Sequence, residues 1–387
     1  MNMDIAIVKC KDYSDESVSQ SFEQLIELVG GLDWVTPGMK IAIKVNLVAP
    51  MKPDSAGTTH PSLLCELVKH LLNKGAEVIV GDSPGGIYTS IFVNKVYSTT
   101  RTTDITKIGG KLNQNFEQKT AFFENGKVLK EFEYTAFLDE ADAIINFCKL
   151  KTHGMMGMSA ATKNLFGTIP GTLKPEYHFK YPNHFDFADM LIDLNEYFKP
   201  KLCIVDAVVG MEGNGPTMGK PRNIGAILAS TNPYKLDLAC AKIIGLTKEN
   251  VTTLEAAFKR DLIPETAEEL SCNDDLDNYV INDYDNITVR KSLWFEDKSK
   301  LTGKIITKFL QSKPKLEKKT CVGCKKCFEI CPAKAITMKN NKPVINRKKC
   351  ISCFCCQEFC PKGAMKVERP IIARLLNTSN KNNTKEK

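Results

Sequence analysis

Two cysteine runs near the end of the chain constrain its fold more than any other feature. Each run has the spacing C-x2-C-x2-C-x3-C-P. Thiolates are soft ligands that suit iron–sulfur clusters, and three of them on one tight loop hold three corners of a [4Fe-4S] cube, while the fourth ligates the other cluster. The spacing therefore predicts two [4Fe-4S] clusters, with Cys321, Cys324, Cys327 and Cys360 as ligands of the first, and Cys350, Cys353, Cys356 and Cys331 as ligands of the second.

The two runs form an internal repeat, because each closes on a proline and similar residues follow both. Zinc knuckles and a disulfide knot are the alternatives. Zinc sites pair cysteines across a longer gap, and a disulfide framework belongs to a secreted chain. Cys355 lies between two ligands and is interpreted as an incidental thiol. Residues 318–367 resemble the bacterial two-cluster ferredoxin module, which implies transfer of single electrons without bond chemistry.

The chain of 387 residues is too long for a ferredoxin alone, so most of it must fold into something else. Its N-terminus enters a strand pattern without a basic leader, and no apolar run approaches the ~20 residues that cross a bilayer. We therefore expect a cytoplasmic protein with no transmembrane segment. Fifteen cysteines fit a reducing compartment. Six of them are predicted to be small buried hydrophobic residues: Cys10, Cys65, Cys148, Cys203, Cys240 and Cys272.

The formal net charge of +8 suggests acidic partners. We attribute the excess to a lysine-rich linker and to the C-terminal tail, and solvated lysines are the simplest explanation. Docking of an acidic electron carrier, and hence a redox partner protein, is the next. Nucleic acid is not expected, because no basic motif with interleaved aromatic residues accompanies the charge.

The first 300 residues alternate strand and helix patterns. Strand-like segments at 5–9, 40–48 and 77–83 alternate with helical ones, and the pattern resumes after residue 140. Such alternation predicts an α/β fold, with a mostly parallel sheet covered by helices on both faces. Residues 87–140 break the rhythm and are interpreted as an insertion with a hairpin at 124–127. The expected domains are 1–300, a basic linker helix at 301–317, a small α+β ferredoxin domain at 318–367 and a disordered tail at 368–387.

Polar residues gather just after the predicted strands, where ligands bind in open parallel sheets. They outline a cleft with several cations, suited to a small anionic substrate that bears carboxylate or phosphate. The candidate catalytic residues are Lys151, His153, Lys163 and Asp206. The candidate cofactor-binding residues are Asn46, Asp82, Asn164, Gly213 and Gly215.

Two of these candidates have competing interpretations. The glycine-rich loop after Asp206 lacks the spacing of a phosphate-binding loop, so it is either a tight turn or a backbone anion nest. His153 serves in acid–base or substrate-binding work, or it is structural. A mononuclear metal site of His153, His184 and Asp206 has no supporting ligand spacing.

Several strings along the chain resemble the domain-of-unknown-function family 362, often described as iron–sulfur cluster-binding proteins. They include KVNLV, VGDSPGG, INFCKLKTHGMMGMSAATKNLFG and IVDAVVGMEGNGPTMGKP. The resemblance spans roughly residues 3–300 and implies an architecture rather than a reaction. The matching positions are Lys44, Asn46, His60, Asp82, Lys151, His153, Lys163, Asn164, Gly167, Asp206, Gly213, Gly215, Pro216, Gly219 and Asp237.

Three functions agree with this pattern. The first is a redox enzyme, or its electron-feeding component, that passes single electrons to a substrate or cofactor in the cleft. The second is a ferredoxin-like carrier or cluster-delivery protein whose large domain only binds a partner. The third is a non-redox enzyme with structural or sensory clusters. No local motif requires a flavin or another organic cofactor, and none excludes one.

Overall fold

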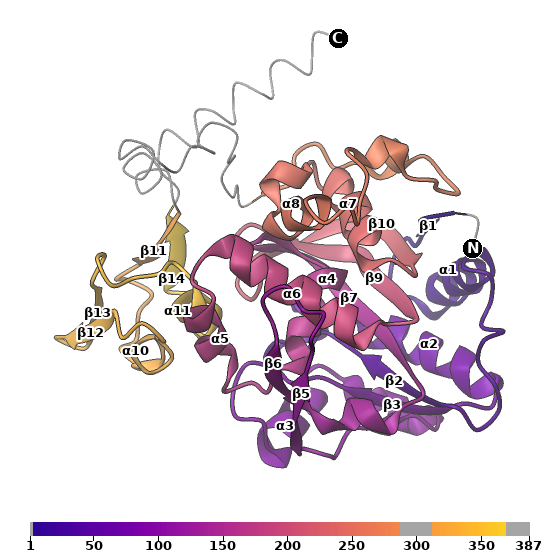
Figure 1. The fold of residues 1–387 in the computed structure, drawn as a ribbon, viewed down its shortest axis with the longest axis horizontal. Coiled ribbons are helices and arrows are strands. Elements are labelled where there is room, and N and C mark those ends of the chain that lie inside the picture. The colour runs from indigo at the N-terminus through magenta and orange to yellow at the C-terminus, as the bar shows by residue number, and fades with distance from the viewer. Residues whose placement is uncertain (1–2, 287–311, 369–387) are drawn as a thin grey trace, which may run out of the picture.

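The computed structural model describes residues 3–286 and 312–368, and an eight-stranded sheet forms its centre (Figure 1). Neighbouring strands from β9 to β4 pair in parallel, whereas β10 is antiparallel to both β9 and β1. The predicted α/β fold with a mostly parallel sheet is confirmed. In spatial order the strands are β1 (Ala6–Lys9), β10 (Lys220–Ser230), β9 (Leu202–Glu212), β7 (Ala143–His153), β2 (Lys40–Lys44), β3 (Glu77–Gly81) and β4 (Lys111–Leu112), with β8 (Gly157–Ser159) paired to β7.

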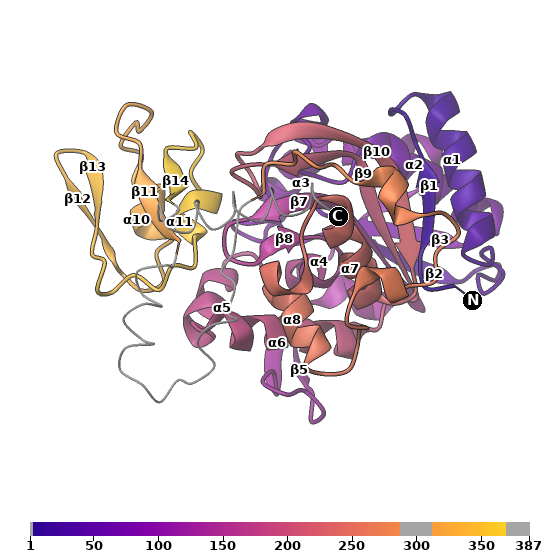
Figure 2. The same ribbon diagram turned by 90° about the horizontal axis from the view of Figure 1, so that it is seen from above.

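Helices cover both faces of the sheet (Figures 1 and 2). On one face lie α1 (Asp15–Leu28), α2 (Pro61–Asn73) and α3 (Ser90–Thr99). On the other lie α4 (Ala161–Asn164), α6 (His184–Phe198), α7 (Pro233–Ile243) and α8 (Thr252–Phe258). Successive strand residues therefore enter different cores, as Ile204 and Val205 do. Burial on both faces explains why these strands are apolar throughout.

Short elements connect this framework. α5 (Lys174–Lys180) precedes α6 near the ferredoxin domain (Figure 1). The 3-10 helices are η1 (Pro53–Ser55), η2 (Thr102–Ile108), η3 (Ala136–Glu140), η4 (Leu165–Thr168), η5 (Lys248–Asn250), η6 (Ala267–Glu269) and η7 (Leu276–Tyr279). Among the described residues, no helix combines the length and the apolar character that a bilayer span requires.

The segment predicted to be an insertion contains a hairpin apart from the main sheet. Its strands are β5 (Gln118–Phe122) and β6 (Glu131–Thr135), which pair antiparallel. The hairpin is confirmed, but its connection is longer than the predicted turn, because the amide of Phe123 still donates to the carbonyl of Lys130. Residues before the hairpin form α3, η2 and β4, so part of this segment extends the sheet.

The C-terminal domain keeps the symmetry of the sequence repeat. Each half has a short helix among its cysteines, α10 (Lys326–Glu329) or α11 (Cys355–Glu358). Two antiparallel pairs flank them, β11 (Lys313–Leu316) with β14 (Met365–Glu368), and β12 (Ile336–Lys339) with β13 (Lys342–Ile345). The linker-helix prediction is wrong at 313–316, because these residues pair as β11 and belong to this domain. The predicted linker at 301–311 and tail at 369–387 lie outside the described residues.

A buried ion pair lies where β2 and β3 end. Lys44 Nζ is 2.7 Å from Asp82 Oδ1, and the two side chains are 0% and 3% exposed. The other carboxylate oxygen of Asp82 accepts the amide of Leu47 at 2.7 Å, and Lys44 also donates to the carbonyl of Val45. Gly167 packs against both charges, and a Cβ atom at this position would collide with them. The pair thus fixes the strand ends around the predicted site.

We expect Lys44→Met to destabilise the protein by about 3–5 kcal/mol, because it leaves the Asp82 carboxylate buried without its partner. Adding Asp82→Asn to Lys44→Met should restore part of this loss, because no charge then lacks a partner. Urea unfolding of the cluster-loaded protein, followed by circular dichroism, measures both variants. A single variant with the wild-type midpoint, or a double variant no more stable than the single one, would contradict this role.

Candidate functional site

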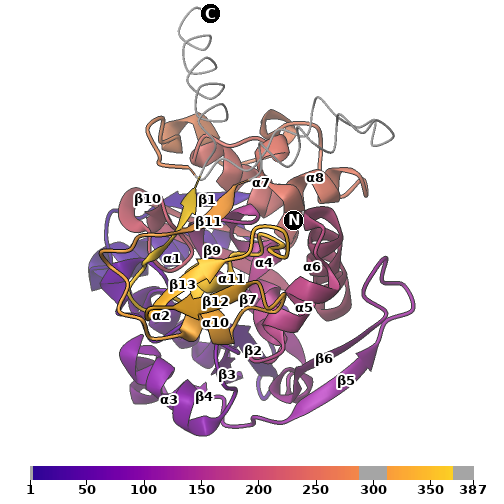
Figure 3. The same ribbon diagram turned by 90° about the vertical axis from the view of Figure 1, so that its left-hand side faces the viewer.

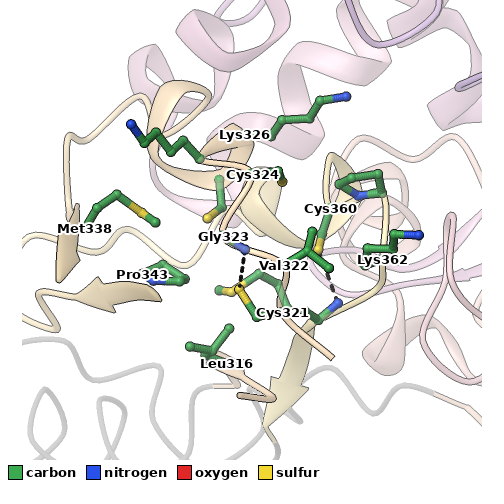
Figure 4. A pocket seen from close by; sticks show the side chains of 15 residues that line it. Leu316, Cys321, Val322, Gly323, Cys324, Lys326, Met338, Pro343, Cys360 and Lys362 are labelled. Carbon is green, nitrogen blue, oxygen red and sulfur yellow. Dashed lines mark hydrogen bonds between the residues drawn. The ribbon is translucent and has the colours of Figure 1, made fainter. Parts of the chain in front are cut away.

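Two cavities in the C-terminal domain are each lined by four of the predicted ligands. Cys321, Cys324, Cys327 and Cys360 line the first, which measures about 360 Å³ with the open solvent included (Figure 4). Cys331, Cys350, Cys353 and Cys356 line the second, of about 340 Å³. In both sets the fourth cysteine comes from the other run of the repeat, as the spacing predicts.

The chemistry of these cavities fits iron–sulfur clusters. Apolar residues complete their walls, and backbone amides point at ligand sulfurs, since Ala335 donates to Cys331 Sγ and Ala364 to Cys360 Sγ, each at 3.2 Å. Burial raises the pKa of the Cys327 thiol to about 11, a cost that iron offsets because it binds the thiolate. Within the described residues, no three His, Cys, Asp or Glu side chains are placed to hold a single metal ion.

The ferredoxin domain sits at the carboxyl ends of the parallel strands, with α11 facing the large domain (Figures 2 and 3). The side chain of Gln357 donates to the carbonyls of Asn214 and Gly215 at 3.0 and 3.2 Å. Thr217 Oγ1 donates to the carbonyl of Glu358 at 3.2 Å. Phe354 is buried in the core of the large domain itself. The loop of the second cavity is therefore part of the predicted site.

Glu358 brings a carboxylate from α11 to His153. The two side chains meet at 2.9 Å between Oε1 and Nε2 and are 16% and 0% exposed. His153 Nδ1 accepts the amides of Met155 and Met156, so the proton of the neutral ring lies on Nε2, the atom that faces Glu358. Burial lowers the pKa of His153 to about 4. Burial alone would raise the pKa of Glu358, but the bond from His153 and the charge of Lys163 lower it to about 2.

Three lysines surround this contact without a carboxylate partner. Lys151 Nζ donates to Asn46 Oδ1 at 2.6 Å and to the carbonyl of Gly57 at 2.8 Å. Lys174 Nζ donates to two carbonyls, of Ser83 and Ile169, at 2.6 Å each. Lys163 lies over the ring of Phe166, within the electrostatic reach of Glu358 and Cys355. Burial lowers the pKa of Lys151 and of Lys174 to about 7. Among the described residues, none of the three forms an ion pair.

Lys163 lies in α4, and contacts with α7 and with the strands β2 and β7 hold this helix in place. Asp237 of α7 accepts the amides of Ala161 and Thr162 at 2.7 and 3.1 Å. Asn164 at the other end of α4 donates to the carbonyl of Lys44 and to Asn146 Oδ1. The predicted binding residues Asn46, Asp82 and Asn164 therefore lie at the site, but their polar groups position lysines and strand ends.

Asp206 does not contact these residues, and its predicted catalytic role stays a prediction. Its side chain is fully buried in β9 and pairs with Lys149 Nζ at 2.5 Å. It also accepts the hydroxyl of Tyr13 at 2.9 Å and the amide of His60 at 3.1 Å, and the rings of Tyr13 and His60 stack. These contacts connect β9 to β7 and to the segment before α1. None of the contacts of Asp206 involves His153 or Lys163.

The glycine-rich loop, a candidate anion nest with Gly213 and Gly215, docks the ferredoxin domain instead. The carbonyl of Gly215, not its amide, faces α11, where it accepts from Gln357. Gly215 also lies so close to Thr152 that a Cβ atom would collide with it. Met218 of the same loop packs on Gly363 of the ferredoxin domain. An anion nest presents amides, so its geometry does not match these contacts.

Sequence reasoning missed Glu358, Gln357, Phe354 and Lys174. A signal for Phe354 was present in the repeat itself, whereas the first run has Glu329 at the position of Glu358. Where the first run has Lys325 and Lys326, the second has Phe354 and Cys355. Apolar residues at positions between ligands indicate a loop that packs on protein, so the second run could have been assigned to the interface. Lys174 had no comparable signal, because only the fold of η4 and α5 brings it to Ser83.

Comparison with known proteins gives two family matches. The model of a domain of unknown function (DUF362) matches residues 41–242, and that of a 4Fe-4S dicluster domain matches residues 313–361. The thylakoid-associated protein sll1697 of Synechocystis sp. is 28% identical over 271 residues, which cover 68% of this chain and 81% of that protein.

Two solved structures are more distant. The lactate racemase apoprotein from Thermoanaerobacterium thermosaccharolyticum aligns with 14% identity and a TM-score of 0.38, over 61% of this chain and 56% of that one. A protein of Thermotoga maritima aligns with 11% identity and a TM-score of 0.33, over 56% of each chain. This chain thus spans little more than half the length of either structure.

Fold and site define an iron–sulfur protein in which a dicluster domain is docked on the strand ends of an α/β domain. Because the first family model covers more than half of the chain, the protein belongs to the DUF362 family. Both parts of the predicted resemblance, the family and the C-terminal dicluster domain, are confirmed.

Paired cysteine variants test the ligand sets. Cys324→Ala with Cys360→Ala removes two ligands of one cavity, so the protein should keep one cluster. Cys324→Ala with Cys331→Ala damages both cavities and should lose both clusters. Iron and sulfide analysis with EPR of the reduced protein distinguishes these results, and Cys355→Ala is the control that keeps both. Equal iron contents in the two double variants would contradict the exchange of fourth ligands.

A pH dependence follows from buried histidines. Burial lowers the pKa of His178 from 6.5 to about 3, and its ring stacks on Phe187 at 4.3 Å. Between these pKa values the unfolded chain holds a proton that the folded protein lacks, so the free energy of unfolding decreases as the pH falls below 6.5. Each such histidine contributes a slope of up to about 1.4 kcal/mol per pH unit.

His178→Phe keeps the stacked ring and removes the titrating group. We therefore expect its stability to fall less than that of the wild type between about pH 7.5 and 5.5, a range around the pKa of a free histidine. Urea unfolding of the loaded protein at three pH values across this range gives both slopes. Parallel slopes would show that His178 is protonated in the folded state.

Proposed function

We propose that this protein is a redox enzyme, or its electron-feeding component, that reduces a small anionic molecule held between α11 and the ends of β3 and β7. The observation that carries this proposal is the seating of α11, whose loop supplies Cys353 and Cys356 and whose Glu358 meets His153. The clusters, when bound, supply single low-potential electrons. A covalently tethered electron source next to a polar site raises its effective concentration there.

The unpaired lysines support an anionic substrate or cofactor. Lys151 and Lys174 each use two donors on neutral acceptors, which leaves one N–H on each, and no hydrogen bond of Lys163 is found among the described residues. Ser83 Oγ and His178 Nδ1 are also buried there without a hydrogen-bond partner in that part of the chain. A carboxylate or phosphate placed among them would offset the cost of burying the lysine charges.

The same residues can supply a proton when the bound molecule is reduced. Burial brings the pKa of Lys151 to about 7, so it can donate a proton near neutral pH and recover it. Lys163, whose charge interacts with that of Glu358, would orient the anion. Burial lowers the pKa of His153 to about 4, and its Nε2 lies 2.9 Å from Glu358 Oε1, so we assign it to positioning α11 rather than to proton transfer.

We also propose that the protein works in a reducing compartment, on the cytoplasmic side of any membrane it meets. Every cysteine of the described residues is free, and the eight predicted ligands, together with Cys355, line the two cavities. Thiols persist as ligands only where disulfides do not form. The thylakoid association in the name of its relative is a property of that protein.

Reoxidation of the reduced protein tests the proposal. The protein is photoreduced anaerobically and mixed with small molecules extracted from cells, separated by charge, while the visible absorbance of its clusters is followed. We expect an anionic fraction to reoxidise the wild type and Lys163→Met to slow this step by tenfold or more, about the contribution of one charged contact. Lys163→Arg should restore part of the rate, and Lys180→Met on the exposed face of α5 is the matched control.

Wild-type rates in Lys163→Met would disprove the site. If no small molecule reoxidises the protein and only a protein fraction does, the carrier or cluster-delivery function replaces the enzyme. Turnover of a molecule at equal rates with oxidised and reduced clusters would identify a non-redox enzyme.

A further inference from the structure

The two halves of the ferredoxin domain lie in opposite environments. Residues 353–357 of the second run are all buried, and Phe354 and Gln357 among them contact the large domain, whereas Cys324, Lys325 and Lys326 of the first run are exposed. Val322 and Phe328, beside the ligands of the first run, are 62% and 47% exposed. The loop of the second cavity therefore packs on the large domain, whereas the loop of the first cavity faces solvent.

Charge divides along the same line. Residues 312–368 contain 14 Lys and Arg against 4 Asp and Glu, and one of these acids, Glu358, faces the large domain. Residues 1–286 contain 28 Lys and Arg against 38 Asp and Glu. The excess of positive charge that the sequence suggested for the linker and tail thus lies largely on the ferredoxin domain, where Lys325, Lys326 and Lys362 line the first cavity.

We propose that an acidic protein that carries single electrons docks on this outer face, defined by Val322, Lys325, Lys326, Phe328 and Lys362. Lys325, Lys326 and Lys362 line the rim of the first cavity, and Figure 4 shows Val322 and Lys362 beside Cys360. Exposed apolar side chains within a basic rim match the usual anatomy of a protein interface. Opposite charge accelerates the encounter of such partners and orients them.

This inference rests on the proposed function, because it names the source of the electrons used at the inner site. In the exchange, the reduced carrier loses one electron and the protein gains one. No bond forms or breaks and no proton moves. The carrier then leaves oxidised, so weak, salt-sensitive binding suits the task better than a permanent complex.

Charge complementarity favours an acidic protein over the other anionic surfaces. A lipid surface or a nucleic acid would bind the basic charge, but neither supplies an electron to a cavity ringed by exposed apolar residues. Val322 and Phe328 lie next to cluster ligands, where a protein partner buries them while its own redox centre approaches. Anionic vesicles and duplex DNA therefore serve as competitors in the test.

The test uses the full cluster-loaded chain and two acidic probes, a plant-type [2Fe-2S] ferredoxin and a flavodoxin. Binding is measured by calorimetry at low and high salt, and the rate of cluster reduction by each reduced probe is measured by stopped flow. We expect Lys325→Glu with Lys326→Glu to weaken binding and slow reduction by at least tenfold at low salt, with the difference lost at high salt. The control is Lys40→Glu with Lys201→Glu. It makes the same change of charge at the amino ends of β2 and β9, whereas the ferredoxin domain lies at their carboxyl ends.

Direct photoreduction, which needs no docking, separates this inference from the proposed function. The outer-face variant should photoreduce and then reoxidise at the inner site like the wild type, whereas Lys163→Met should bind the probes normally. Failure of both probes to bind, equal binding by the outer-face variant, or tighter binding of vesicles or duplex DNA than of either probe would overturn the proposal.

Discussion

The carboxylate of Glu358 brings the ferredoxin domain to the residues of the predicted site. Glu358 leaves solvent when α11 is seated, and a buried carboxylate is stable only if hydrogen bonds and charge replace its water. The His153 ring lies 2.9 Å from this carboxylate, and Lys163 supplies a positive charge near it. The position of His153 in turn depends on its Nδ1 bonds to the amides of Met155 and Met156, which fix the loop between β7 and β8. The orientation of the ferredoxin domain is therefore set by the same residues that form the predicted site.

This dependence gives the site an unusual electrostatic balance. Three lysines without carboxylate partners lie around one carboxylate that belongs to the ferredoxin domain. Burying so much positive charge is unfavourable, and the lowered pKa values of Lys151 and Lys174 express that cost. Under the proposed function, an anion bound there would interact favourably with the lysines and would raise their pKa again.

The sequence alone was sufficient to predict features that depend on the spacing of cysteines or on the alternation of strand and helix patterns. Cysteine spacing predicted which four residues share a cavity, and alternating strands and helices predicted the covered sheet. It was insufficient for Asp206, because a polar residue after an apolar run looks alike whether its partner is a ligand or a buried lysine such as Lys149. It was also insufficient for Gly213 and Gly215, because loop composition does not reveal whether amides or carbonyls face outward.

The repeat shows where a finer prediction was available. Within each loop the cluster fixes the cysteines, so only the residues between them are free to match their surroundings. Lys325 and Lys326 are exposed to solvent, as charged residues usually are. Phe354 and Cys355 are apolar and buried, and Phe354 packs in the core of the neighbouring domain. Both loops have the cysteine spacing that binds a cluster, so cluster binding does not explain why the residues between the cysteines differ. The differences come from what each loop contacts, because α11 of the second run packs on the large domain and Lys325 and Lys326 of the first run are exposed.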